Sequence, residues 1–398
     1  MLIKRRSFIK VGALASAGLF TPNLFANLGS PVVKAGNKVL VVLQLSGAND
    51  GLNTVIPYRN DEYFKQRPTI SISRDKALQL TDEIGLNPAL TALKGLYDDG
   101  HLAILNGVGY PDNSRSHFRS MDIWESASAS NQYLQTGWIG RYLDQVNKVK
   151  ESTTRAIEVD DLLSLALKGD QSFGLALKDP KKFYQVTQSD YIKKLAHLKH
   201  THEHENTVDY LYETLTRTVD SADYILDQST IGMTKMDYPS TKIGDNFKTV
   251  ASLIFSDIDT KVYYLSLGGF DTHTGQVNRQ DTLFKQINAA LKAFTDDLKK
   301  NNRFEDVLVM SFSEFGRRVA QNASNGTDHG AASSMFLMSG GLKTSGLINE
   351  IPSLTDLDQG DLKYSIDFKQ VYATILNKWL KVDEVNILGE KYDLLPFI

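Results

Sequence analysis

Short apolar runs alternate with amphipathic helical periodicity along the chain, and this alternation predicts an α/β fold. Runs rich in β-branched residues predict buried strands at residues 38–45, 102–106, 262–267, 307–312 and 334–338. Apolar positions at helical spacing predict helices at residues 90–97, 117–128, 139–149, 280–300 and 371–380. Strands that alternate with helices imply a three-layer α/β/α arrangement around a mostly parallel central sheet.

Residues 145–245 differ from the rest because they are rich in charge and have helical periodicity, clearest at 191–226. We interpret them as a helical insertion in a single α/β domain that spans residues 27–398. Four histidines fall inside this region, at positions 197, 200, 202 and 204. Two of them lie four residues apart and would share a helix face. A metal site and a solvated polar helix are both compatible with that spacing, and we favour the helix.

The first 26 residues have the pattern of a twin-arginine export signal. A basic head that contains Arg5 and Arg6 is followed by Ser-Phe-Ile-Lys, an apolar stretch over residues 11–20, and a small residue at Ala26. Ten apolar residues are too few to cross a bilayer core, which needs about 20. The pattern predicts passage through the twin-arginine translocase to the periplasm or medium, without a stable membrane anchor. A buried amphipathic N-terminal helix is the alternative.

Composition excludes several classes of protein. The 398 residues include no cysteine, which rules out disulfides, thiolate metal sites, Fe–S clusters and a cysteine nucleophile. The net charge is -3, and without residues 1–26 the chain carries 40 basic and 47 acidic residues. This mildly acidic balance argues against a nucleic-acid partner, which would favour a strong positive excess.

Polar clusters follow the predicted strands, where ligands of parallel sheets bind. The candidate residues in these clusters are Asp50, Ser114, Arg115, Ser116, His117, Asp271, His273, Glu314, Arg317, Asp328 and His329. Each alone has a structural explanation as a turn former, a helix cap or a hydrogen-bonded side chain. If the strands are neighbours, the clusters converge on one cleft. Carboxylates and imidazoles without thiols suit a Zn, Mn or Mg site.

Five sequence motifs together resemble the domain-of-unknown-function 1501 family. They are LSGANDGLNTVIPY (45–58), NSRSHF (113–118), GGFDTH (268–273), SFSEFGRR (311–318) and DHG (328–330). With the leader, the resemblance covers nearly the whole chain. That family is grouped with the alkaline-phosphatase-like superfamily of metal-dependent phosphatases, sulfatases and phosphomutases. The resemblance therefore implies an alkaline-phosphatase-like fold and a metal site more firmly than it implies a reaction.

The superfamily pattern can be laid on this chain in sequence order. The resemblance implies that Asp50 is the metal-binding aspartate after the first strand, and that Ser114 or Ser116 is the nucleophile that opens a helix. It implies one complete metal site from Asp271, His273 and His329. The place of an Asp-His pair that normally serves both metals holds Glu314-Phe315 here. The second site, from Asp50 and Glu314, therefore lacks its histidine, which leaves one ion or two open.

The favoured hypothesis is an exported metal-dependent hydrolase of phosphate or sulfate esters, small or polymer-borne. A divalent cation would lower the pKa of a hydroxyl and neutralise charge on the transferring group. The serine would form a covalent ester. Arg115 or Arg317 would clamp the anionic oxygens, and His117 would act as general acid.

Two alternatives come from different functional classes. One is a non-catalytic secreted or cell-surface binding protein on the same fold, because a fold does not dictate function. The other is a serine esterase of the SGNH type, because residues 47–50 match GxND. In that class the nucleophile precedes the GxND block, whereas here only the leader lies upstream of the first strand, so we disfavour it.

Overall fold

The computed structural model describes residues 37–146, 153–196 and 206–398. The predicted leader and the four histidines between 197 and 204 lie outside the described residues. The chain divides into two compact units. Among the described residues, unit 1 takes residue 37 and those within 134–236 and 248–265, and unit 2 takes residues 38–133, 237–247 and 266–398.

Unit 2 is built around a mixed sheet whose strands were largely predicted. The strand order is β13-β5-β12-β9-β1, with β16 also beside β5. The strands are β1 (Val39–Ser46), β5 (Leu102–Gly109), β9 (Val307–Phe312), β12 (Ser333–Met338), β13 (Gly346–Leu347) and β16 (Ile366–Asp367). Every residue of β5 and β9 is buried. Burial on both faces explains why these strands are continuous apolar runs.

Strand direction determines which loops meet. β1 pairs parallel with β9, whereas β12 pairs antiparallel with both β9 and β5. β5, β9 and β1 therefore run the same way, and the loops after them leave at one edge of the sheet. β12 instead enters the sheet at that edge, so the residues that precede it lie there. The predicted mostly parallel sheet is confirmed, with β12 as the antiparallel member.

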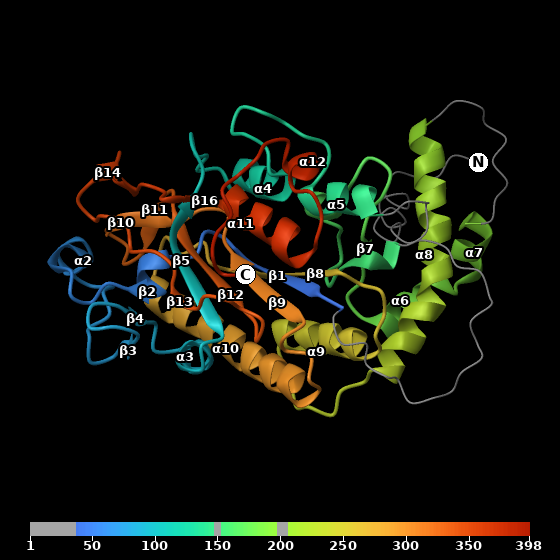
Figure 1. Cartoon of the computed structure of the whole chain (residues 1–398), viewed down its shortest axis with the longest axis horizontal. Coiled ribbons are helices and arrows are strands. Elements are labelled where there is room, and N and C mark those ends of the chain that lie inside the picture. Colours follow the sequence, from blue (N-terminus) through green and yellow to red (C-terminus); the bar gives the residue numbers. More distant parts are fainter. Residues whose placement is uncertain (1–36, 147–152, 197–205) are drawn as a thin grey trace. The chain divides into compact units, whose positions relative to one another are not determined.

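Helices cover both faces of the sheet in unit 2 (Figure 1). α4 (His117–Ser126) and α11 (Phe368–Thr374) lie on one side, and α3 (Thr91–Asp98) and α10 (Gln276–Lys300) on the other. The indole of Trp124 in α4 stacks between β9 and α11, with ring centroids 5.0 Å from Phe312 and 4.3 Å from Phe368. The predicted three-layer α/β/α arrangement is confirmed in this unit.

Short elements surround the central sheet of unit 2. They are β2 (Val55–Ile56), α2 (Asp61–Gln66), β3 (Leu78–Gln79), β4 (Gly85–Leu86), β10 (Arg317–Gln321), β11 (Thr327–His329), β14 (Leu357–Asp358), β15 (Asp361–Leu362), a π-helical turn (Ile375–Trp379) and α12 (Val385–Leu388). β10 pairs with β11 and β14 pairs with β15, both antiparallel. The sequence did not predict these strands, because two to five residues are too few to show a period.

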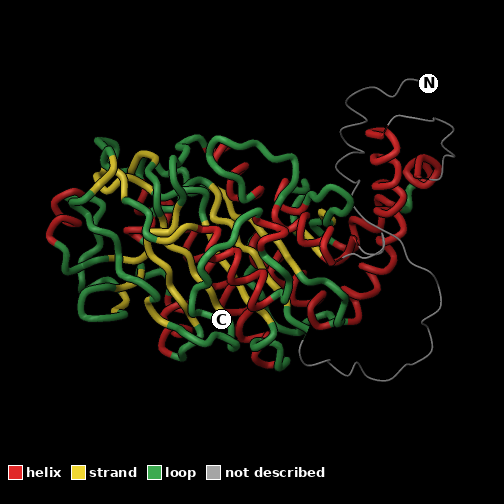
Figure 2. The backbone as a smooth tube through the Cα atoms, turned by 45° about the horizontal axis from the view of Figure 1, so that its top comes forward, coloured by secondary structure: helices red, strands yellow, loops and turns green. Residues whose placement is uncertain are grey.

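Unit 1 contains the parallel strands β6 (Ala156–Glu158), β7 (Leu175–Ala176) and β8 (Val262–Gly268), whose last residues belong to unit 2. Its helices are α5 (Trp138–Val146), α6 (Pro180–Thr187), α7 (Asp190–Ala196), α8 (Asn206–Ile231) and, from residue 248, α9 (Lys242–Phe255). Helices α6, α7 and α8 contact one another (Figure 2). α7 and α8 share a core of Ile192, Leu195, Ala196, Leu215 and Val219. In the described part of the chain, no helix is long and apolar enough to span a bilayer.

Candidate functional site

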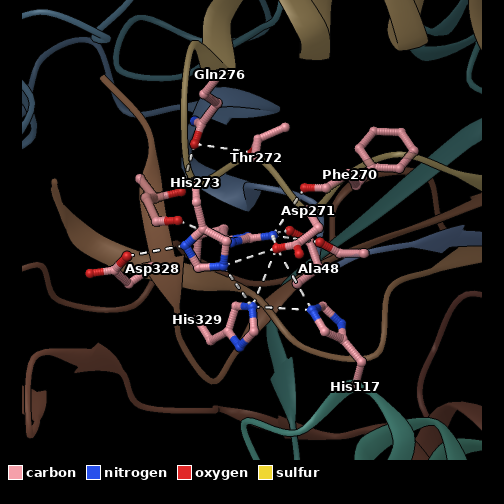
Figure 3. A network of polar contacts seen from close by, with 12 residues as sticks. Ala48, His117, Phe270, Asp271, Thr272, His273, Gln276, Asp328 and His329 are labelled. Atoms are coloured by element: carbon pink, nitrogen blue, oxygen red, sulfur yellow. Dashed lines mark hydrogen bonds and ion pairs between the residues drawn. The ribbon is translucent and has the colours of Figure 1, made fainter. Parts of the chain in front are cut away.

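Three imidazoles and one carboxylate of unit 2 converge at the sheet edge (Figure 3). His329 Nε2 lies 3.1 Å from His117 Nε2 and 3.0 Å from His273 Nε2. Asp271 Oδ1 lies 3.0, 3.3 and 3.7 Å from the Nε2 atoms of His273, His329 and His117. His117 begins α4, Asp271 and His273 precede α10, and His329 ends β11. We call these four residues the histidine cluster.

The separations within the histidine cluster fit a bound metal ion. Zinc bonds of about 2.0–2.1 Å in a tetrahedron separate ligand atoms by about 3.3 Å, within the range seen here. His117 Nε2 and His329 Nε2 face each other at 3.1 Å, a separation that suits either a shared cation or a hydrogen bond from one protonated ring. His117, Asp271 and His329 form a group of potential metal ligands whose atoms lie within 4.8 Å of one another. Nitrogen and carboxylate donors without thiolates suit Zn and related divalent ions.

Each imidazole is oriented by a partner at its other nitrogen. His117 Nδ1 lies 2.8 Å from Glu314 Oε1, and His273 Nδ1 lies 3.1 Å from Asp328 Oδ1. His329 Nδ1 lies 2.9 Å from the Arg115 carbonyl oxygen. A carbonyl only accepts, so Nδ1 of His329 carries a proton and its Nε2 lone pair faces the cluster. Such partners fix the tautomer of metal-binding histidines.

Glu314 and Asp328 therefore lie behind the cluster and orient its imidazoles, instead of joining the ligand set as the sequence suggested. The Glu314 carboxylate is 1% exposed and also accepts from the Gly47 amide at 2.8 Å. Asp328 is 59% exposed. His117, expected as the general acid, has both ring nitrogens engaged in the cluster. The histidine missing beside Glu314 is thus supplied by His117 from another loop.

We predict that Glu314→Gln weakens zinc affinity by about 10–100-fold, the range for loss of a partner behind a metal-binding histidine. The amide keeps the size of the side chain but loses the charge that holds His117. Asp328→Asn is the matched variant and is expected to weaken zinc affinity less. The Asp328 carboxylate is exposed, so solvent and salt screen its interaction with His273. Competition with a chromogenic chelator measures both affinities. Equal affinities for Glu314→Gln and the wild type would contradict the assignment.

The surroundings of the cluster shift the pKa values of its members in different directions. Burial lowers the pKa of His329 and keeps it neutral. A hydrogen bond to Glu314 raises the pKa of His117. Partial burial acts to raise the pKa of Asp271, but the hydrogen bond and charge of Arg317 outweigh it and bring the pKa to about 2. The shifts at Asp271 and His329 favour the ligand forms of these two side chains, whereas a metal ion would have to displace a proton from His117 more often because of its raised pKa.

Arg317 is a buried tether and not the anion clamp that the sequence suggested. Its guanidinium donates to Asp271 Oδ1 at 2.8 Å. It also donates to backbone carbonyl oxygens of three loops, namely those of Gly47, Ala48, Phe270 and Thr327, at 2.6, 2.7, 3.1 and 3.0 Å. With 0% of the side chain exposed, these bonds leave no face for a substrate. Arg317 fixes the loops that carry the cluster.

Asp50 faces a buried arginine that the sequence analysis missed. Arg67 binds its two carboxylate oxygens at 2.6 and 3.0 Å, and both side chains are at most 1% exposed. Asp50 also caps the amide of Leu52 and accepts from Gln276. Its oxygens are thus occupied, and we leave it out of the proposed ligand set. Arg67 follows no predicted strand, so no sequence signal pointed to it.

Gly47 allows the loop after β1 to reach the cluster. Its φ of +113° is left-handed, and a Cβ there would lie 2.5 Å from the Asp271 amide nitrogen. The Phe270 amide donates to the Ser46 carbonyl oxygen at 3.2 Å. Only glycine combines this φ with so close an approach.

The two candidate serines differ in their surroundings. Ser114 Oγ accepts from the Ser116 amide at 3.3 Å, in a local turn. Ser116 is exposed and occupies the N-cap of α4 without capping it through its side chain. Its hydroxyl therefore remains available next to His117. Arg115 Nε donates to Asp361 Oδ2 at 2.8 Å.

The fold and the cluster define an α/β protein with a candidate metal centre at the carboxyl edge of its sheet. Residues 103–388 match the family model described as "Protein of unknown function (DUF1501)". The chain therefore belongs to this family, as its motifs predicted. No curated protein shows significant sequence similarity to it.

Solved structures with similar folds come from proteins of very different sequence. The lipoteichoic acid synthase LtaP from Listeria monocytogenes is 10% identical, with 98% of this chain and 79% of that chain covered and a TM-score of 0.38. A protein in the alkaline phosphatase superfamily from Vibrio parahaemolyticus is 11% identical, with 85% and 69% covered and a TM-score of 0.35. The PsFucS1 sulfatase from Pseudoalteromonas sp. is 11% identical, with 80% and 66% covered and a TM-score of 0.35. At these scores the matches carry no argument about the site, which rests on this chain's own residues.

Proposed function

We propose that the chain is an exported hydrolase of phosphate or sulfate esters that works with a single divalent metal ion. His117, Asp271, His273 and His329 would hold the ion. The observation that supports this most directly is the convergence of their four ligand atoms, with every imidazole fixed from behind. Zinc is the ion that best suits three imidazoles and one carboxylate.

Ser116 is the nucleophile in this proposal. Its exposed hydroxyl sits at the start of α4, beside His117, where the helix N-terminus favours a developing negative charge. The serine hydroxyl releases its proton to solvent, and the bond from Oγ to phosphorus or sulfur forms as the bond to the leaving oxygen breaks. The leaving oxygen takes a proton from solvent. Water then cleaves the covalent ester and restores the serine. The metal would lower the pKa of the attacking hydroxyl and neutralise charge on the transferring group.

Two 4-nitrophenyl esters, the phosphate and the sulfate, test this proposal. We expect hydrolysis of at least one ester, loss of activity with a chelator, and recovery on adding zinc. Ser116→Ala should reduce kcat by about a thousandfold or more, as expected when a covalent nucleophile is removed. Ser114→Ala is the matched control, because its hydroxyl already serves a local turn, and should keep most of the activity. Full activity in Ser116→Ala would rule out this nucleophile.

Binding without turnover is the second candidate function. The short distances between the four ligand atoms of the histidine cluster favour it. Four side-chain donors can fill a tetrahedral shell, whereas catalytic zinc sites keep one position open. A protein that binds zinc stoichiometrically, yet hydrolyses neither ester, would support this second function and overturn the first.

Export is proposed from the sequence of residues 1–26. Replacing Arg5 and Arg6 together by lysine is expected to keep the chain in the cytoplasm, because the paired arginines are the signal that the translocase reads. Cell fractionation followed by immunoblotting measures this. An unchanged periplasmic or secreted fraction would contradict the proposed route.

A further inference from the structure

Two arginines share one buried carboxylate beside the histidine cluster. Asp361 in β15 is only 2% exposed, whereas the side chains of Arg115 and Arg318 are each 37% exposed. Arg115 donates from Nε and Nη2 to Asp361 Oδ2, at 2.8 and 2.5 Å. Arg318 Nε lies 3.6 Å from Asp361 Oδ1, beyond hydrogen-bond distance. One carboxylate thus holds two half-exposed guanidinium groups in place.

The donors of this pair are mostly unused. Each guanidinium carries five N–H donors. Among the described residues, the Arg318 guanidinium has no hydrogen-bond acceptor, and Asp361 Oδ1 accepts no hydrogen bond. The β14–β15 turn passes close to Arg318, since a Cβ on Gly360 would lie 3.4 Å from Arg318 Nη1. Arg318 is therefore held on one side while its donors stay open on the other.

Both arginines are next to residues that orient the cluster. The carbonyl oxygen of Arg115 fixes His329 at 2.9 Å. Arg318 follows the buried tether Arg317 in β10. A hydrogen bond from Asn322 is the main cause that lowers the pKa of Asp328, the partner of His273, and the charge of Arg318 adds to it. Both arginines thus lie in segments that carry the cluster, Arg115 just before His117 and Arg318 just after Arg317.

We propose that Arg115 and Arg318 form an oxyanion-binding pair that takes phosphate or sulfate next to the metal centre. Planar guanidinium groups bind tetrahedral oxyanions through paired hydrogen bonds. Asp361 offsets one of the two positive charges and orients both side chains, yet leaves most donors free. The role of the pair in orienting an ester rests on the proposed function, whereas binding of the free anion does not. Arg318 thereby takes the role of anion clamp that was expected for Arg317.

Titration of the full chain with inorganic phosphate and sulfate, followed by calorimetry, tests this inference. The titrations use chelator-treated and zinc-loaded protein. We expect anion binding in both forms, weakened about tenfold or more by Arg318→Gln and by Arg115→Gln, and partly restored in Arg318→Lys. Arg59→Gln is the matched control: Arg59 is exposed, donates to the Asp82 carbonyl oxygen, and should bind the anions as the wild type does. Circular dichroism confirms that each variant is folded.

The outcomes separate this inference from the proposed function. Wild-type affinity in folded Arg318→Gln would overturn the arginine pair. Anion binding that needs zinc and is unchanged in Arg318→Gln would place the anion on the metal alone. This result would contradict the arginine pair but would agree with the proposed hydrolase. Arg318-dependent binding in a protein that takes up no zinc supports the pair and overturns the proposed metal-dependent function.

Discussion

His329→Ala is expected to abolish stoichiometric zinc binding, from about one ion per chain to about a tenth or less. His329 Nε2 is the central atom of the cluster, at 3.0 and 3.1 Å from the two other imidazoles and 3.3 Å from Asp271. No neighbouring side chain in the described structure offers a replacement nitrogen at this position. Elemental analysis by plasma mass spectrometry, after dialysis against buffer with trace zinc, measures the loss.

His101→Ala is the matched control for that measurement. His101 packs edge-on against Phe304, with ring centroids 5.2 Å apart, and has no contact with the cluster. Its removal deletes one imidazole and should leave the zinc content unchanged. Thermal unfolding of His329→Ala in chelator should match that of chelated wild type, which shows that the fold is intact. If His329→Ala retains one zinc ion per chain, the metal binds elsewhere and the histidine cluster is not its site.

Arg317→Lys is expected to lower the free energy of unfolding by about 3 kcal/mol, because several backbone carbonyl oxygens lose a buried donor. Lysine keeps the charge but cannot span the four carbonyl oxygens and Asp271 that the guanidinium joins. Several buried acceptors would then lack donors, each at a cost of about 1–3 kcal/mol before relaxation. Urea unfolding followed by fluorescence measures the change.

Arg318→Lys provides the comparison, because Arg318 is the next residue in β10 and is half-exposed. A surface substitution of this kind changes stability by about 0.5 kcal/mol or less. If both variants unfold at the same urea concentration, Arg317 is not the tether that its contacts indicate. If Arg317→Lys fails to fold, zinc-supplemented expression of Arg317→Met provides the second measurement, and wild-type stability there would also contradict the tether.

The strands and the convergence of the site were predictable from the sequence for a physical reason. Buried strands must be apolar over their whole length, so runs such as 102–106 and 307–312 stand out. The loops that follow parallel strands share an edge, which brings His117 and Asp271 together. His329 ends β11 and precedes the sheet strand β12, and it joins the same edge because β12 runs antiparallel.

The role of each side chain at that edge was not predictable. Glu314 and Asp328 are chemically equal to Asp271 as ligands, and only the fold shows that they face imidazole Nδ1 atoms. Arg317 and Arg318 are neighbours in one short strand, and alternation sends one inward and the other outward. When the sequence does not predict a strand, it also does not show which residues of that strand face inward and which face outward.

Asp50 shows a second reason why the roles of the side chains could not be predicted from the sequence. Its partner Arg67 comes from a segment just after α2, where no apolar strand or turn motif marks a site. A contact of this kind depends on how a loop folds back, which hydrophobic periodicity does not encode. The position of Asp50 after the first strand is therefore typical of a metal ligand, whereas in the structure Asp50 forms an ion pair with Arg67.

The ligands of the histidine cluster are far apart in the chain, since His117 and His329 are separated by 212 positions. A growing chain on the ribosome therefore has no complete cluster until residue 329 has been made and the hairpin of β10 and β11 has formed. An ion held there closes a long loop, and such a cross-link removes more conformational freedom from the unfolded chain than a local one. Metal uptake at this site would consequently report that the chain has been made at least to residue 329 and that the loops of unit 2 have come together, and ion content could serve as a test of maturation.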